Sequence, residues 1–187
     1  MRRTIYMLFA IPLVLAGTLT SGPASAHFVP APCDFITGGG FIFGNSGQFI
    51  NFGAHGGCKH GQFWGHVNVL DHSTDPPAHL RSTSITGYLF DPAFPNARDI
   101  CGTGVVTANG GTFDVTFRVR MEDNGEPGVG VDRFGIRLSN GYLQTTRIIS
   151  GGNIQLHKPN PSTTGPSPAP TEAQMCGTLA TPEGGGA

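Results

Sequence analysis

Charged residues are scarce in this chain of 187 residues. Asp, Glu, Lys and Arg together make up 12% of it, which is about half of the share in an average globular domain. Lysine occurs only at Lys59 and Lys158, and the formal net charge is -1. The chain therefore lacks the basic surplus of a general nucleic-acid binder. The shortage of strong helix formers such as Lys and Glu also argues against a helical bundle.

Catalytic motifs are missing as well. The sequence contains no Gly-x-Ser-x-Gly nucleophile elbow, no phosphate-binding loop and no dinucleotide fingerprint. We therefore predict that the protein is not an enzyme. A small extracellular hydrolase stays as an alternative, because the acidic region at residues 122–132 holds carboxylates of the kind that glycoside hydrolysis uses.

The first 26 residues have the features of a secretory signal peptide. A start with two arginines precedes an apolar stretch at residues 5–16, and an Ala-x-Ala cleavage site occupies residues 24–26. The apolar stretch is too short for a stable membrane span. We therefore predict a secreted protein whose mature chain begins at His27 and has no membrane span after cleavage.

All four cysteines follow the predicted cleavage site: Cys33, Cys58, Cys101 and Cys176. An even number of cysteines in an exported chain predicts two disulfides. Three pairings are possible, and the sequence does not choose among them. A structural zinc site is the rival interpretation, but the chain has no Cys-x-x-Cys spacing.

The residues that are abundant favour β-structure. Apolar and polar residues alternate at 113–121 and again at 133–139, and 13 phenylalanines supply material for a core. Asn109-Gly110 and Asn140-Gly141 are strong hairpin signals, because both residue types tolerate the positive φ angles of a type I′ turn. The sequence therefore predicts an all-β domain at residues 27–157, either an antiparallel β-sandwich or a partly open barrel of about eight or nine short strands.

The segment at residues 158–187 differs from the rest of the chain. It contains six prolines and is otherwise rich in small residues. Such a composition predicts a flexible, disordered C-terminal tail. If Cys176 is bonded, the tail is attached to the domain at that point.

Seven short motifs occur in a fixed order between residues 33 and 157. They are D-F-I-T-G-G-G-F-I at 34–42, F-W-G-H-V-N at 63–68, T-S-I-T-G-Y at 83–88, I-C-G-T-G at 100–104, E-D-N-G-E-P-G at 122–128, D-R-F-G-I-R-L-S-N-G at 132–141 and G-G-N-I-Q-L-H at 151–157. This series resembles the post-COAP type of bacterial secreted domain, which is often found beside choice-of-anchor surface domains. The resemblance implies an extracellular, β-rich accessory domain and transfers no catalytic or binding residue.

An acidic loop separates the two alternating segments. Its candidate calcium ligands are Asp123, Asn124, Glu126 and Asp132. Calcium prefers carboxylate, amide and carbonyl oxygens, and the glycines of this loop allow the backbone to wrap around an ion. The spacing does not match an EF-hand. The alternative is a polar turn in which Asp and Asn cap backbone groups of their own loop.

Four arginines are predicted to share one exposed face of the sheet: Arg118, Arg120, Arg133 and Arg137. Guanidinium groups bind carboxylates or phosphates in a bidentate manner, so this face is a candidate site for an acidic glycan. The alternative is a solvated ladder of salt bridges to the neighbouring carboxylates of Asp114, Glu122 and Asp132. Three aromatic residues are further candidates for sugar stacking, although a role in the core is more usual: Trp64, Tyr88 and Tyr142.

Histidines form the remaining cluster, and neutral imidazoles can hold zinc or copper. The residues are His55, His60, His66, His72 and His79. Their spacing is irregular, so surface or hydrogen-bonding roles are the alternative.

Together these features predict a secreted, non-catalytic accessory or binding module of the bacterial cell exterior. Its partner is expected to be a cell-surface glycan or another exported protein. A calcium-dependent binding module that uses the acidic loop is the second hypothesis, and the small hydrolase is the third.

Overall fold

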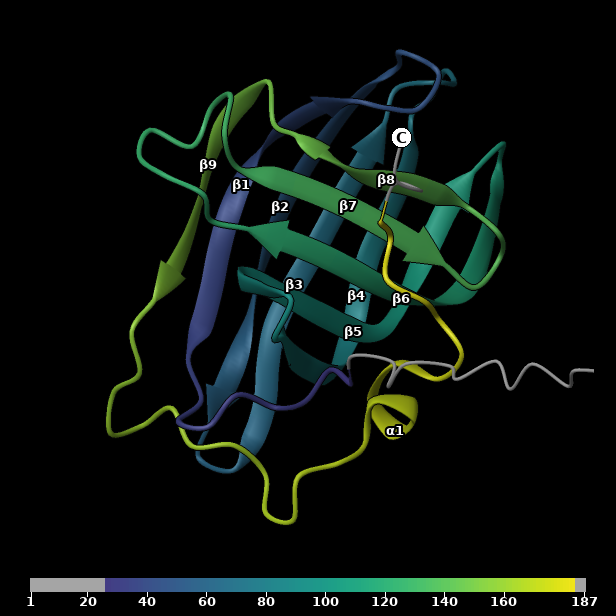
Figure 1. Cartoon of the computed structure of the whole chain (residues 1–187). Helices are drawn as coiled ribbons and strands as arrows, with labels where there is room; N and C mark the ends of the chain where they lie inside the picture. Colours follow the sequence, from purple (N-terminus) through teal and green to yellow (C-terminus); the bar gives the residue numbers. More distant parts are fainter. Residues whose placement is uncertain (1–25, 184–187) are drawn as a thin grey trace, which may run out of the picture.

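The computed structural model describes residues 26–183, and these residues form an all-β domain (Figure 1). Nine antiparallel strands make up one sheet with the order β8-β7-β6-β5-β4-β3-β2-β1-β9. The sheet curls strongly into an open half-barrel. The predicted all-β class is confirmed, and of the two predicted architectures the structure has the partly open barrel. The predicted signal peptide, residues 1–26, lies outside the described residues except for Ala26.

Neighbouring strands along the chain pair as hairpins from β1 to β8, and β9 returns to pair with β1. The strands are β1 (Phe35–Phe43), β2 (Phe49–Lys59), β3 (Gln62–Asp71), β4 (Ala78–Asp91), β5 (Phe94–Ala108), β6 (Gly111–Glu122), β7 (Arg133–Leu138), β8 (Leu143–Ile148) and β9 (Gly151–His157). The turn between β5 and β6 places Asn109 and Gly110 at φ angles of 51° and 74°. This hairpin was predicted from its Asn-Gly pair, and both residues take the positive φ that a type I′ turn requires.

The core fills the concave side of the curled sheet. The Phe52 ring of β2 stacks on the Phe134 ring of β7 with centroids 4.0 Å apart, so strands from distant places in the sheet meet across the interior. Four of the five apolar residues that the alternation places on the inner face of β6 are also buried: Val115, Phe117, Val119 and Met121. The fifth, Phe113, lies near the start of the strand and is exposed. Apolar burial of this kind supplies most of the favourable free energy of folding.

The C-terminal segment crosses the outer side of the sheet. A short helix, α1 (Glu172–Cys176), begins with a capping box at Thr171 and buries Met175 and Cys176. Pro182 then accepts a hydrogen bond from the backbone N–H of Thr146 at 2.6 Å. Residues 158–183 thus follow a defined path against the sheet, where the sequence predicts a disordered tail. The difference has a physical cause, since a disulfide, a cap and buried side chains fix a segment whose composition alone favours no structure.

Both predicted disulfides are present. Cys33 pairs with Cys58, and Cys101 pairs with Cys176. The second bond joins β5 to α1 and so attaches the C-terminal segment to the sheet. Among residues 26–183, no helix is long and apolar enough to cross a membrane.

Candidate functional site

Two arginines predicted to be exposed are buried. Arg118 and Arg120 lie on β6 and have relative exposures of 1% and 0%. Both donate to the buried carboxylate of Asp99 on β5, with Nε distances of 2.9 Å from Arg118 and 2.7 Å from Arg120. An isolated buried charge is very costly, so each guanidinium depends on its carboxylate partners.

Carboxylates from other segments complete this arrangement. Asp91 of β4 accepts a hydrogen bond from Arg120 at 2.7 Å, and Glu172 of α1 accepts one from Arg118 at 2.7 Å. Glu183 also pairs with Arg120. We call this group the arginine network: Arg118, Arg120, Asp91, Asp99, Glu172 and Glu183.

Titration behaviour agrees with this pairing. Burial alone would lower the pKa of Arg120, but Asp99 and Asp91 outweigh burial and raise the pKa above its usual range. Burial would raise the pKa of Glu172, yet hydrogen bonding and attraction from Arg118 hold that pKa below its ordinary value. The charged forms of Arg120 and Glu172 are therefore favoured by their partners in the network.

The prediction of an exposed arginine face is thus wrong for Arg118 and Arg120. The prediction that these two arginines pair with neighbouring carboxylates of the same strands and loop is wrong as well. The four arginines do share the outer face, because Arg118 pairs directly with Arg137 in the strand register and Glu122 pairs with Arg133. The C-terminal segment covers only part of this face. Arg133 remains exposed beside Glu122, with 3.8 Å between Arg133 Nε and Glu122 Oε2.

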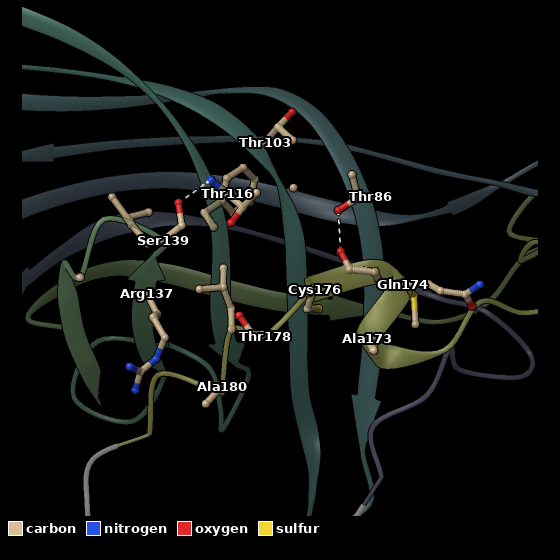
Figure 2. Close-up of a pocket in the computed structure, with 17 residues that line it drawn as sticks. Thr86, Thr103, Thr116, Arg137, Ser139, Ala173, Gln174, Cys176, Thr178 and Ala180 are labelled. Atoms are coloured by element: carbon tan, nitrogen blue, oxygen red, sulfur yellow. Dashed lines mark hydrogen bonds between the residues drawn. The ribbon is translucent and has the colours of Figure 1, made fainter.

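Arg137 lies at a groove next to the covered part. The groove has a volume of about 630 Å³. Its floor comes from β4 to β7, and its wall comes from α1 and the residues after it (Figure 2). Figure 2 shows Arg137 and Ser139 on the β7 side, with Thr86 and α1 across from them. We refer to this hollow as the groove.

Hydroxyl groups and one cation dominate the polar lining of the groove. The hydroxyl-bearing residues are Thr86, Thr103, Thr116, Ser139 and Thr178. Ser139 Oγ accepts from the Thr116 N–H at 3.0 Å, and Thr86 Oγ1 donates to the Met175 carbonyl at 2.7 Å (Figure 2). The Nε of Arg137 is buried and has no hydrogen-bond partner among the described residues. A buried N–H without an acceptor is costly, and the side chain that carries it is half-buried in the groove lining, so the remaining N–H groups of its guanidinium are the ones placed to donate to a ligand.

The described lining of the groove contains no Asp, Glu or His. Proton transfer in catalysis usually relies on one of these side chains, with His the most frequent. The polar side chains that the lining does provide are hydroxyls, the amide of Gln174 and the guanidinium of Arg137.

The acidic loop connects strands instead of gathering its carboxylates. Asp132 is fully buried, and it accepts from the N–H of Asn124 and the N–H of Ile154, both at 2.8 Å. Asp123 accepts from the Leu156 N–H at 2.7 Å. Carboxylates of the loop before β7 thus accept hydrogen bonds from backbone N–H groups of β9. The predicted role, in which Asp and Asn cap backbone groups of their own loop, therefore extends to a neighbouring strand.

The other two candidate calcium ligands are also engaged. Glu126 accepts from the side-chain amide of Asn153 at 3.1 Å, and Asn124 donates to the Val131 carbonyl at 3.1 Å. Within the described part of the chain, no group of three or more His, Cys, Asp or Glu side chains is arranged to hold a metal ion. The calcium hypothesis gains no support from this geometry.

Replacing Asp132 by Ala is expected to lower the free energy of unfolding by about 1–3 kcal/mol. The change leaves two N–H groups without their acceptor, and one of them lies in β9. Urea unfolding measures the loss. Glu126→Ala is the matched control and should change stability by less than about 0.5 kcal/mol, because Glu126 is exposed. Equal effects of the two substitutions would show that the buried carboxylate does not hold the loop.

The histidines are dispersed over several sites. His55 and His66 face each other across β2 and β3, with ring centroids 6.3 Å apart. Burial and the neighbouring His66 lower the pKa of His55, so His55 stays neutral more readily than a free histidine. His72 contacts Asn51 and His79 contacts Asn68. His60 is exposed in the turn between β2 and β3.

The aromatic candidates also differ from one another. Tyr88 is fully buried, and its hydroxyl donates to Asp34 at 2.7 Å, so it belongs to the core. Tyr142 is half-buried and donates to Asp71 at 2.6 Å; burial and this carboxylate raise its pKa well above the usual range. Trp64 is half-buried on the outer side and lies beside His55. None of the three lines the groove.

Sequence reasoning missed four members of the arginine network: Asp91, Asp99, Glu172 and Glu183. The only signal for them in the sequence was that several acidic residues had no predicted partner, in a chain with few charged residues. Comparison with protein-family models, with curated proteins and with solved structures gave no match to this chain.

Proposed function

We propose that this protein is a secreted, non-catalytic binding module of the bacterial cell exterior, and that the groove binds a carboxylate-bearing oligosaccharide. The observation that carries the proposal is the half-buried guanidinium of Arg137, whose Nε has no partner among the described residues, in a groove lined with hydroxyl groups. The post-COAP resemblance is in keeping with this role and belongs to the same proposal.

Ligand chemistry follows from the lining. A guanidinium group recognises a carboxylate through two parallel hydrogen bonds, which gives orientation as well as affinity. Ser and Thr hydroxyls both donate and accept, so they match the hydroxyl groups of a sugar. The groove volume lies within the range of about 300–1,000 Å³ typical of small-molecule sites.

Secretion is supported by the disulfides. Two disulfides in a small domain are typical of oxidising compartments outside the cytosol. The sequence adds the predicted signal peptide at residues 1–26.

The test is titration calorimetry of the mature protein with tetragalacturonate, a carboxylate-bearing tetrasaccharide. Arg137→Ala is expected to weaken binding at least tenfold, because loss of a charge-assisted hydrogen bond costs about 1.5–3 kcal/mol. Arg133→Ala is the matched control. It removes an arginine of the same sheet face that lies outside the groove, so the affinity should change less than twofold.

Tetragalacturonate methyl ester separates charge recognition from sugar recognition. It has the same sugar units without the negative charges, and it should bind at least tenfold more weakly than the acid. Equal binding of acid and ester, or equal losses in the two arginine variants, would refute a carboxylate site at Arg137.

A further inference from the structure

The residue that follows the predicted cleavage site lies against the arginine network. The backbone nitrogen of His27 is 3.3 Å from Oε2 of Glu172, and its Nδ1 is 3.2 Å from the same carboxylate. Its Nε2 lies 3.0 Å from Asp91. The side chain of His27 is only 14% exposed. The start of the predicted mature chain is therefore placed between two members of the network.

The charges of the network do not balance by themselves. Two guanidinium groups face four carboxylates, which leaves an excess of two negative charges: the cations are Arg118 and Arg120, and the anions are Asp91, Asp99, Glu172 and Glu183. Three of the four anions are at most one-third exposed, so solvent does not fully screen this excess. A cation at His27 would compensate for part of it.

Cleavage after Ala26 supplies that cation. In the unprocessed chain the His27 nitrogen belongs to a peptide bond and carries no charge. Hydrolysis of the Ala26–His27 bond consumes one water and releases an amine, which is mainly protonated below its usual pKa of about 7.7–8.0. The resulting ammonium lies within reach of Glu172.

We propose that the α-ammonium group of His27, created by signal-peptide removal, binds Glu172 and completes the arginine network. The inference rests on the secretion included in the proposed function, but it is independent of the groove ligand. Removal of the leader thereby stabilises the folded domain. The folded state is most stable only after the signal peptide has been cleaved.

The same contact reaches the groove. Glu172 is the first residue of α1, and α1 forms part of the groove wall. The bond from the chain start to Glu172 thus adds to the Cys101–Cys176 disulfide in holding this wall. A neutral or displaced chain start weakens this attachment and leaves the disulfide, the Arg118–Glu172 pair and the Thr86–Met175 hydrogen bond to hold the wall.

The test compares two chains prepared with a traceless protease, one starting at His27 and the other at Ala26. The second chain is one residue longer and keeps a free amine, but its His27 nitrogen is a neutral amide. The chain that starts at His27 is expected to melt about 3–8 °C higher at pH 6.5. Mass spectrometry of the exported protein should also show His27 as its first residue.

A double-mutant cycle with Glu172→Gln shows whether Glu172 is the partner. In the Glu172→Gln background the difference between the two chain starts should fall below about 1 °C, because the carboxylate is gone. Glu126→Gln is the matched control, since it removes an exposed carboxylate that contacts Asn153, and it should leave the difference intact.

Three results would overturn the inference: equal melting temperatures for the two chain starts, an undiminished difference with Glu172→Gln, or an exported chain that starts elsewhere. Loss of tetragalacturonate binding is a separate readout. A protein that fails to bind this sugar but shows the melting difference would refute the groove ligand and leave the His27 contact standing.

Discussion

Replacing Asp99 by Asn is expected to lower the free energy of unfolding by about 3–5 kcal/mol, because the change breaks a buried ion pair from one side. Asp99 is 1% exposed and accepts hydrogen bonds from both Arg118 and Arg120. The amide keeps the shape of the side chain and removes its charge, so both guanidinium groups lose their shared counter-ion. For a domain of this size the melting temperature should fall by about 8–15 °C.

Asp114→Asn is the matched control for this substitution. Asp114 is an exposed residue of β6, the strand that carries both arginines, and the same chemical change there should alter stability by less than about 0.5 kcal/mol. Urea unfolding of the oxidised protein gives both values. A loss below about 1 kcal/mol for Asp99→Asn would show that the network is not an essential part of the fold.

Removing the Cys101–Cys176 disulfide is expected to cost about 2–4.5 kcal/mol, the range from typical disulfides to the chain-entropy value for a loop of this length. The two residues are 75 positions apart. The double substitution to Ala also detaches α1 from β5, so the groove loses the covalent attachment of its wall. We therefore expect binding of tetragalacturonate to weaken at least tenfold in the same variant.

The Cys33–Cys58 disulfide offers the comparison. It closes a loop of 25 positions, and its loss should cost about 2–3.5 kcal/mol. It does not line the groove, so binding should change less than twofold while the variant is folded. Equal loss of binding in both variants would mean that overall stability, rather than the position of α1, governs the groove.

Local patterns were sufficient to predict much of the sheet. Val115, Phe117 and Val119 alternate with polar residues because one face of their strand is turned to the core. This pattern can be seen in the sequence of the strand alone. The hairpin at Asn109-Gly110 likewise depends on two adjacent residues and their φ angles. Fold class follows from such features because each is decided within a few residues.

The arginine network depends on distant residues, which explains why the sequence analysis missed it. Arg118 and Arg120 have the polar positions of an alternating strand, and such positions normally face water. Here residues 172–183 cover them, and Glu172 contacts Arg118 across 54 positions. No pattern in the sequence of β6 indicates that another segment covers these two arginines. The composition of residues 158–187 favoured disorder, while the bond at Cys176 ties the segment down.

For the same reason, only part of the candidate site could be predicted from the sequence. Arg137 was correctly placed on the outer face with the other three arginines, since strand register follows from the hairpin pattern. The groove beside it could not be predicted, because its wall comes from α1 and the residues after it, which belong to the segment whose composition predicts a flexible tail.

Two-dimensional NMR of the ¹⁵N-labelled mature protein during titration with tetragalacturonate shows directly whether the groove binds this sugar. We expect saturable shifts of the backbone amides that line the groove, with the largest at Thr116, Ser139 and Thr178. The shifts should be lost with Arg137→Ala. Shifts centred instead on β2 and β3 at His55 and Trp64, or no shifts at millimolar sugar, would contradict a carboxylate-binding groove.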